Sequence, residues 1–408
     1  MSDILLWIWL SVKLPCGSPY ADLLMERFEH SAKNIFNASA EDFSKISGLP
    51  AKISRALCDK DLTEASKILD WCTQNNVGLL PYDSRFYPKR LKSAERAPLL
   101  LYYKGRLIDF DDNVCVAMVG TRRITDYGKR EAYKISRDLT LGGAVVVSGM
   151  ARGIDTMCHR GALDAGGYTV AVLGRGIDRA YPPENAYLMN EIVRSGVVIT
   201  EYKPFTPPLG SNFPIRNRII SALSLGTLVV EADARSGAMI TARHAEKQGR
   251  DIFSLPGNVG ELNSVGPNRL LKRGAKIVTG ALDVLEEYEY LYPHRIRIEN
   301  LPVFMPKFIP AHVKNEPKKI EKKRTVKKIE ENCEVAEKPL EIKAAPRDTS
   351  SLSENEKKLY SLFPESGTVS ADELSRSGFS VGVVLQNLTM LEIKGFIKAA
   401  PGGVYTKT

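Results

Sequence analysis

The chain of 408 residues lacks the patterns that hold metal ions or disulfide frameworks. Its six cysteines lie far apart, no Cys-x-x-Cys pair occurs, and no histidine stands at metal-ligand spacing from another ligand. Scattered cysteines of this kind are typical of proteins kept in a reducing compartment. We therefore expect a cytoplasmic protein without a metal site.

Long apolar runs and nucleotide-binding signatures are also missing. The apolar run 4–10 is too short to span a bilayer and follows an aspartate, so we interpret it as a core helix and expect no membrane partner. No Gly-x-x-x-x-Gly-Lys-Ser/Thr occurs, which argues against a Walker-type ATPase. The turn Gly174-Arg175-Gly176 lacks the third glycine of a dinucleotide fingerprint, and we expect no cofactor.

What the chain does contain is an apolar strand that leads directly into a cationic glycine turn. Residues 114–119 are followed by Gly120-Thr121-Arg122-Arg123 and then by the start of a helix. A helix N-terminus at the carboxyl end of a strand offers unpaired N–H groups and partial positive charge, to which the arginines add full charges. This pattern predicts a site for a nucleotide or a nucleic-acid phosphate.

The same construction recurs along the chain. Further strands are expected at 144–147, 169–173, 197–200 and 227–230, separated by helical patterns at 127–141, 156–165, 184–194, 216–225 and 237–248. Strands that alternate with helices of this length predict an α/β fold with a doubly wound, mostly parallel sheet. All the glycine turns then lie on one edge of that sheet.

Composition shifts divide the chain into four regions. Residues 1–75 predict a small helical domain, whose Ser47-Gly48-Leu49-Pro50 break suits either a DNA-backbone contact or simple packing. Residues 76–290 contain the sheet. Between 294 and 350 there are 14 Lys/Arg and 9 Asp/Glu, so 291–350 is interpreted as a basic disordered linker, a tether in preference to a DNA-binding tail.

The last region, 351–408, predicts a winged helix. Helices are expected at 352–363, 371–377 and 381–394, with strands 396–398 and 404–406 on either side of a Pro-Gly-Gly turn. The third helix has only Lys394 as a cation, which is little for sequence-specific duplex binding. Contact with a protein, or weak contact with DNA, is the favoured interpretation.

Several side chains near the glycine turns have alternative structural and functional interpretations. Asp155 and Asp178 are interpreted as helix caps rather than catalytic acids, and His159 and His244 as structural residues. Phe213 serves either stacking or core packing. Two glycine turns supply positive charge for a phosphate through Arg122, Arg123 and Arg152. For Arg216 and Arg218, which have Asn217 between them in the sequence, phosphate binding competes with ion pairs to Glu201 or Glu231.

In combination, these segments resemble one bacterial family. Between about residues 80 and 287 the chain is similar to DNA-processing protein A, also called DprA or Smf, in its motifs Val119-Gly120-Thr121-Arg122-Arg123, Ser148-Gly149-Met150-Ala151-Arg152-Gly153-Ile154-Asp155, Gly176-Ile177-Asp178 with Tyr181-Pro182-Pro183-Glu184-Asn185, Phe213-Pro214-Ile215-Arg216-Asn217-Arg218-Ile219-Ile220-Ser221, Val230-Glu231-Ala232 with Ser236-Gly237, and Leu255-Pro256-Gly257-Asn258. Two departures are Cys158 in place of a common alanine, and Thr200-Glu201-Tyr202-Lys203-Pro204 in place of Ser-Glu-x-Pro-x-Gly.

The resemblance implies an extended Rossmann-like domain that dimerises and binds single-stranded DNA without sequence preference. It also implies protection of incoming DNA and loading of a RecA-type recombinase during natural transformation, with no catalytic turnover. It places DNA contacts at Gly120, Thr121 and Arg122. Support is expected from the turn with Ser148, Gly149, Arg152 and Gly153, and from the segment with Phe213, Arg216, Asn217 and Arg218.

Two alternatives remain. A phosphoribohydrolase that cleaves nucleoside monophosphates would use a strand-end glutamate, here Glu231, but its Pro-Gly-Gly-x-Gly-Thr turn is replaced by Ala222-Leu223-Ser224-Leu225-Gly226-Thr227. An adaptor role for the linker and winged helix is compatible with DNA binding.

Overall fold

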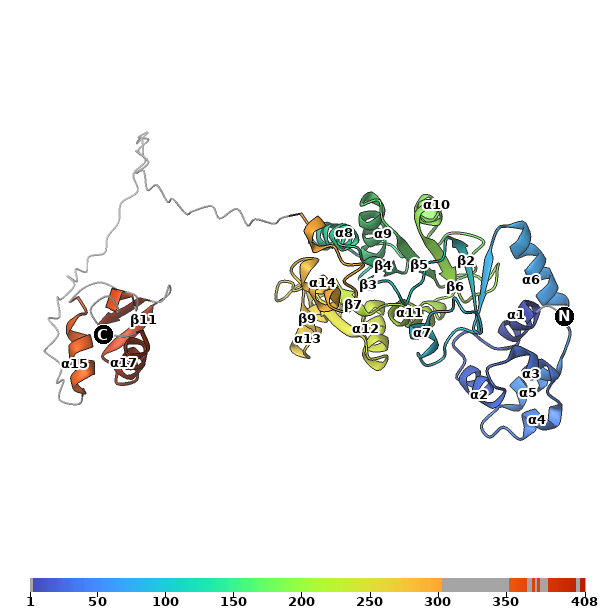
Figure 1. Ribbon diagram of the computed structural model, residues 1–408, viewed down its shortest axis with the longest axis horizontal. Helices are drawn as coiled ribbons and strands as arrows, with labels where there is room; N and C mark the ends of the chain where they lie inside the picture. Colours follow the sequence, from blue (N-terminus) through green and yellow to red (C-terminus); the bar gives the residue numbers. More distant parts are fainter. Residues whose placement is uncertain are drawn as a thin grey trace, which may run out of the picture. The chain divides into compact units, whose positions relative to one another are not determined.

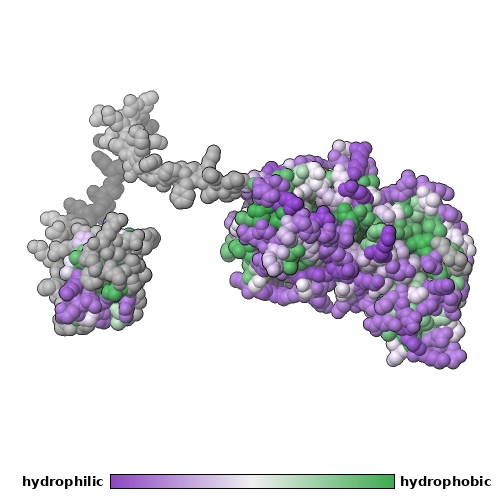
Figure 2. All heavy atoms as spheres, in the orientation of Figure 1, coloured by the Kyte–Doolittle hydropathy of each residue, from purple (hydrophilic) through white to green (hydrophobic). Residues whose placement is uncertain are grey.

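The structure is a computed structural model that describes residues 3–302, 352–364, 369–370, 373–374, 381–400 and 404–407 (Figure 1). The chain divides into two compact units, Met1–Ala311 and His312–Thr408. In the described residues no helix is both long and apolar enough to cross a membrane. On the face shown in Figure 2, the surface of the larger unit is mostly hydrophilic, and its apolar residues are in patches.

A nine-stranded sheet forms the centre of the larger unit, in the order β1-β2-β6-β5-β4-β3-β7-β8-β9. The strands from β6 to β9 in that order are parallel, and β1 and β2 add an antiparallel edge. Their bounds are β1 Gly78–Pro81, β2 Leu100–Gly105, β3 Cys115–Val119, β4 Val145–Ser148, β5 Thr169–Leu173, β6 Val197–Thr200, β7 Gly226–Val229, β8 Asp251–Ser254 and β9 Lys276–Ile277. This confirms the mostly parallel α/β sheet, with all seven parallel carboxyl ends on one edge.

Helices cover both faces of the sheet (Figure 1). One face packs against α8 and α9, where Ile135 and Cys158 meet Val116 and Met118 of β3. The other face packs against α11 and α12, where Ile219 and Ala242 meet Ala117. The helices of this region are α7 Lys89–Lys92, α8 Asp126–Leu141, α9 Ile154–Asp164, α10 Ala186–Ser195, α11 Asn212–Ala222, α12 Gly237–Lys247, α13 Val265–Lys272 and α14 Leu282–Glu289. The central strands are buried on both faces and are mostly apolar, as is typical of parallel sheets.

The N-terminal helices confirm the predicted helical region, but they share one core with the sheet. Their bounds are α1 Asp3–Lys13, α2 Tyr20–Arg27, α3 Ala32–Asn37, α4 Ala40–Ser44, α5 Ala51–Cys58 and α6 Thr63–Gln74. The apolar run in α1 is the expected core helix, with Trp7 and Trp9 each 1% exposed. Its side chains belong to the same hydrophobic cluster as Leu101 of β2 and Val198 of β6. The helical region is therefore a layer packed on the sheet's antiparallel edge.

The sheet region contains two strands that the sequence did not predict, and it extends beyond its predicted C-terminal boundary. The turn-rich segment 76–113 contains β1 and β2, which the sequence patterns did not indicate. Beyond residue 290, Ile296 is 5% exposed in the core, and Arg297 donates a backbone hydrogen bond to Gly142. Residues 291–302 are thus folded against the sheet, and the predicted linker boundary at 290 is too early. Residues 303–351 lie outside the described residues.

The smaller unit has the elements expected of a winged helix. Its described elements are α15 Glu354–Ser361, β10 Val369–Ser370, α17 Val381–Ile393, β11 Ile397–Ala400 and β12 Val404–Lys407. Strands β11 and β12 pair in antiparallel register, with Ile397 opposite Lys407. The Pro-Gly-Gly turn and most of the predicted helix 371–377 lie outside the described residues. Lys394, the cation after α17, forms an ion pair with Glu356 at 2.8 Å.

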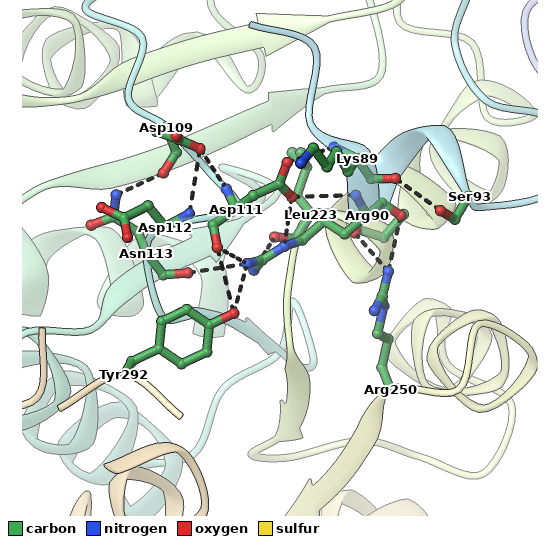
Figure 3. A network of polar contacts seen from close by, with 11 residues as sticks. Lys89, Arg90, Ser93, Asp109, Asp111, Asp112, Asn113, Leu223, Arg250 and Tyr292 are labelled. Carbon is green, nitrogen blue, oxygen red and sulfur yellow. Dashed lines mark hydrogen bonds and ion pairs between the residues drawn. The ribbon is translucent and has the colours of Figure 1, made fainter. Parts of the chain in front are cut away.

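An arginine network closes the amino edge of the sheet (Figure 3). The guanidinium of Arg90, 8% exposed, donates to the backbone oxygens of Asp111, Asn113 and Leu223 and to the Tyr292 hydroxyl, at 3.1–3.4 Å. Asp111 in turn accepts from the backbone N–H of Lys89 at 2.7 Å. The network joins α7 to the segments that precede β3 and β7.

Candidate nucleic-acid interface

Two glycine turns pack against each other where β3 and β4 end. The Thr121 N–H donates to the Glu231 carbonyl at 2.7 Å, and the Ile154 N–H donates to the Thr121 carbonyl at 3.2 Å. Gly153 has φ +80°, which suits glycine, and a Cβ there would come within 2.9 Å of the Arg122 Cα. A Cβ on Gly120 would meet the Glu231 carbonyl at 2.9 Å. With the backbones this close, the side chains of Arg122 and Arg123 are left at the surface.

The helix start after the first turn is stabilised from within. The Thr125 hydroxyl caps α8 by accepting from the Gly128 N–H at 3.1 Å. The carboxylate of Glu231, 4% exposed, accepts from the Thr125 N–H at 3.1 Å and from the Thr125 hydroxyl. Glu231, the residue that a hydrolase would need, thus holds the turn together and is not among the residues that line the cavity described next.

An open cavity of about 560 Å³ lies at this edge of the sheet. The turn after β3 contributes one wall, α11 and the start of α12 another, and the turn after β4 and the loops after β5 and β6 the rest. Among its lining residues are Thr121, Arg122, Arg123, Tyr181, Phe213 and Arg216. The structure therefore brings the first glycine turn and the Phe213–Arg218 segment together, as the sequence predicts.

Phe213 is the aromatic centre of this cavity. Its ring is half-buried and lies 5.6 Å from the Tyr181 ring at an interplanar angle of 31°. The guanidinium of Arg122 is 5.1 Å from the Phe213 ring centroid, and that of Arg216 is 5.8 Å away. Two cations near one aromatic ring provide both charge and a flat apolar surface. Of the two roles left open for Phe213, this placement favours stacking.

Arg216 lies beneath the cavity as a buried cation. It is 3% exposed and donates to the carbonyl oxygens of Gly149, at 2.9 Å, and Val172. Burial lowers the pKa of Arg216 to about 10, and the charge of Arg122 acts in the same direction, so the group remains protonated near neutral pH. Burial also raises the pKa of the neighbouring Asp155, against the opposing effect of the Arg216 charge.

The prediction that Asp155 and Asp178 cap helices is wrong. The Asp155 carboxylate accepts from the Ala151 N–H at 3.2 Å, and no side-chain cap is formed at the start of α9. The Asp178 carboxylate accepts from the Phe205 N–H at 2.7 Å and from Arg175 at 3.2 Å. Both carboxylates therefore hold loops in place at the carboxyl edge.

Arg218 forms the ion pair that the sequence left open. Its Nη2 donates to both oxygens of Glu201, at 2.8 and 2.7 Å, and both side chains are less than a tenth exposed. Arg218 does not line the cavity, although Arg216, two positions earlier on α11, does. Of the two arginines on α11, Arg218 thus forms a structural ion pair and Arg216 belongs to the candidate site. Arg218 is therefore not a candidate DNA ligand.

Of the remaining candidates, Asn217 lines the cavity, whereas Ser148 and Arg152 do not. The Ser148 hydroxyl is buried and donates to the Met118 carbonyl at 2.7 Å. Asn217 accepts from Arg216 Nε at 3.1 Å and donates to the Gly237 carbonyl at 3.2 Å. Arg152 is exposed and pairs with Glu184. These contacts fit the supporting roles expected for the second glycine turn and for Asn217.

The histidines of the sheet region have no catalytic arrangement. His159 is wholly buried, and its Nδ1 lies 2.8 Å from the Thr169 hydroxyl. Burial, helped by the charge of Arg216, lowers the pKa of His159 to about 3, so the ring is neutral at physiological pH. His244 is half-buried, and burial lowers its pKa as well. The structural interpretation holds for His159.

Tyr181 is the functional candidate that the site prediction missed. It lines the cavity and its ring lies 5.6 Å from that of Phe213, whereas the sequence indicates Tyr181 only as part of a family motif. An aromatic residue shortly after a glycine turn at a strand's carboxyl end was the available signal. Its proximity to Phe213 depends on how the loop after β5 meets α11.

The sequence of this chain is similar to those of known DNA-processing proteins. The chain matches the family described as DNA recombination-mediator protein A over residues 78–289, and the DprA winged helix domain over residues 343–403. It is 41% identical to protein Smf of Escherichia coli over 54% of this chain and 59% of that protein. It is 43% identical to DNA processing protein DprA of Streptococcus pneumoniae over 50% of this chain and 72% of that protein.

A solved structure shows the same fold. The X-ray structure of DNA processing protein A from Streptococcus pneumoniae aligns with a TM-score of 0.61 and 35% sequence identity, covering 69% of this chain and 97% of that one. The chain spans less than two thirds of the E. coli relative. Because the family match covers more than half of its residues, the chain belongs to the DNA recombination-mediator protein A family, whose members include proteins named DprA and Smf.

Proposed function

We propose that this protein binds single-stranded DNA without sequence preference in the cavity at the carboxyl edge of its sheet. The observation that carries the proposal is the placement of Arg122 against the Phe213 ring within an open cavity, next to a second exposed arginine, Arg123. Arginines neutralise phosphates, and an aromatic face accepts any base because every base has a π-face. The names of the relatives support DNA as the ligand.

Single strands fit this cavity better than duplex DNA. An unpaired strand can turn its phosphates toward the glycine turn and its bases toward Phe213 and Tyr181. Duplex DNA keeps its bases stacked and offers only backbone to such a site. Backbone neutralisation is independent of sequence, so the binding is expected to be non-specific and dependent on salt.

Several further roles belong to the same proposal. A protein that coats single strands and mediates recombination would protect incoming DNA and pass it to a RecA-type recombinase in natural transformation; the family description supports this role. We also propose a homodimer formed through the Rossmann-like domain and a cytoplasmic location. No catalytic step is proposed, because Glu231 holds the Thr125 turn.

The test is a titration of the full chain with single- and double-stranded oligonucleotides of equal length at two salt concentrations. We expect tighter binding to the single strand and equal affinity for unrelated sequences. Equal or tighter binding to random duplex would overturn the proposal. A parallel assay should find no free base released from nucleoside monophosphates, and robust turnover that Glu231→Gln abolishes would establish the hydrolase instead.

A further inference from the structure

One large aromatic side chain stands in solvent on a backbone that disfavours it. Phe205, in the loop after β6, is 63% exposed and has φ +66°. An aromatic residue rarely adopts the left-handed region, because its Cβ crowds the following carbonyl oxygen. Hydrophobic burial does not explain this conformation, since most of the ring is in water.

The backbone of Phe205 is held firmly. Its N–H donates to the Asp178 carboxylate at 2.7 Å, and the neighbouring Thr206 carbonyl accepts from the Gly176 N–H at 3.0 Å. Asp178 is anchored by Arg175 at 3.2 Å. These contacts join the loop after β5 to the loop after β6, so the backbone that carries the exposed ring is fixed in position.

The ring meets a second aromatic residue from the N-terminal helices. Phe205 and Trp71 of α6 are 5.2 Å apart in an edge-to-face arrangement with an interplanar angle of 67°. Trp71 is half-buried, whereas the chain's other two tryptophans, Trp7 and Trp9, are each 1% exposed. Lys104 lies 5.9 Å from the Trp71 ring centroid. Two aromatic rings and a cation thus come from three separate elements.

This cluster is continuous with the candidate DNA cavity. The loop that carries Phe205 goes on to Pro208 and Gly210, which line the cavity, and the loop that holds it carries Tyr181. Arg179, 81% exposed, lies 4.0 Å from the Asp178 carboxylate and places an exposed positive charge on the loop after β5. A strand leaving the cavity over these two loops would reach Phe205 with its bases unpaired.

We propose that Phe205 and Trp71 form a base-stacking step that extends the path of single-stranded DNA from the cavity onto the N-terminal helices. This inference rests on the proposed function and adds a second contact region to it. The occupant is a nucleobase, because the exposed Phe205 ring meets Trp71, which has the Lys104 ammonium 5.9 Å from its ring centroid, and because Phe205 lies on a loop that lines a cationic cavity. The helical layer then takes part directly in DNA binding.

The experiment compares three Phe205 variants of the full chain with a matched control. Phe205→Ala is expected to weaken binding to long single strands about tenfold, within the range for loss of one base stack. Phe205→Gly should weaken binding equally while thermal stability is kept or raised, because glycine adopts positive φ without strain. Phe205→Tyr should retain affinity. Phe86→Ala, whose ring is also 63% exposed, should leave affinity unchanged.

Three readouts distinguish base stacking from a charge effect and from a contact with another protein. The salt dependence of binding should be the same for Phe205→Ala and the original chain, because no phosphate contact is lost. Quenching of tryptophan fluorescence by single strands should disappear in Trp71→Phe, since Trp7 and Trp9 are buried. Unchanged affinity of Phe205→Ala alongside impaired recombinase capture would overturn the inference in favour of a protein contact.

Failure of this inference is distinguishable from failure of the proposed function. If Arg122→Ala weakens single-strand binding and Phe205→Ala does not, the cavity binds DNA and the stacking step is wrong. If neither variant changes affinity, both are wrong.

Discussion

The two ends of the parallel sheet use arginine in opposite ways. At the amino edge, Arg90 is buried and directs its guanidinium at backbone oxygens of Asp111, Asn113 and Leu223 (Figure 3). At the carboxyl edge, Arg122 and Arg123 are exposed, and no ion-pair partner of their side chains is found within the described part of the chain. The same residue type thus stabilises one edge and is free to meet a ligand at the other.

The difference follows from what each strand end offers. Segments that enter the strands at the amino edge present carbonyl oxygens, which accept hydrogen bonds from a cation. At the carboxyl edge, glycine turns and helix starts present N–H groups and positive partial charge. Arg122 and Arg123, exposed on the turn after β3, therefore have no such acceptors beside them, whereas the buried Arg216 reaches the carbonyl oxygens of Gly149 and Val172 from below the cavity. An anionic ligand supplies the missing acceptors. Residue type alone therefore does not identify the binding arginines.

Removal of Arg90 gives the sharpest contrast with the binding edge. Arg90→Ala leaves several carbonyl oxygens without their donor and removes the ion pair with Asp111, and we expect the free energy of unfolding to fall by about 3 kcal/mol. Denaturant unfolding measures the loss, with Lys89→Ala, whose side chain is exposed, as the control. A fall below about 0.5 kcal/mol would mean that the network is no more stabilising than surface contacts.

The burial of His159 should be detectable in the pH dependence of the free energy of unfolding. Unfolded chain takes up a proton at His159 near pH 6.5, whereas the native state does so only near pH 3, because burial and Arg216 disfavour the cation. The free energy of unfolding should therefore fall as pH decreases, and His159 contributes up to about 1.4 kcal/mol per pH unit between these values.

The measurement is unfolding of His159→Gln and of the original chain across that range. The free energy of unfolding of His159→Gln should depend less steeply on pH than that of the original chain. His30→Gln, at an exposed position, should keep the original pH dependence. Parallel slopes for all three proteins would show that His159 titrates normally.

Arg122 should affect binding and not folding. Arg122→Ala is expected to weaken single-strand binding about tenfold, or about 1.4 kcal/mol, for all sequences alike. The log–log salt slope should flatten by about 0.7, the value for one phosphate of a single strand. Oligonucleotide titrations at several salt concentrations measure both quantities. A large fall in melting temperature would instead show that Arg122, like Arg90, stabilises the fold.

The smallest effect is expected at the rim of the binding edge. Arg152 is engaged by Glu184, and both side chains are largely exposed. Glu184→Gln should release Arg152 and tighten single-strand binding about twofold at low salt, with no gain at high salt, because exposed charges are screened. Titrations at the two salt concentrations check this. Weaker binding would mean that the pair positions Arg152 for DNA.

Local sequence patterns predicted most of the sheet correctly. The expected strands 169–173 and 197–200 coincide with β5 and β6, because strands buried on both faces are continuous apolar runs between turn residues. Strands β1 and β2 were missed. Their pairing joins Leu80 to Leu101 and Tyr102 to Thr200, and such distant partners leave no local pattern.

The candidate site, too, could be predicted only in part from local sequence patterns. The glycine turn with Arg122 and Arg123 could be placed at the carboxyl edge from the sequence, because the order of strand, turn and helix is local and parallel strands share that edge. The site's aromatic part could not be completed, because Tyr181 meets Phe213 only when the loop after β5 packs against α11.

The sequence was sufficient for the parallel sheet, its cationic turns and the family, because strand periodicity, glycine turns and motif spacing are properties of short segments. It could not assign the arginines of α11. Arg216 and Arg218 are two residues apart, about 200° around the helix, so they face opposite sides. One lies under the cavity and the other pairs with Glu201, and folding decides between these roles because it sets which side of α11 faces the cavity and which faces a buried carboxylate.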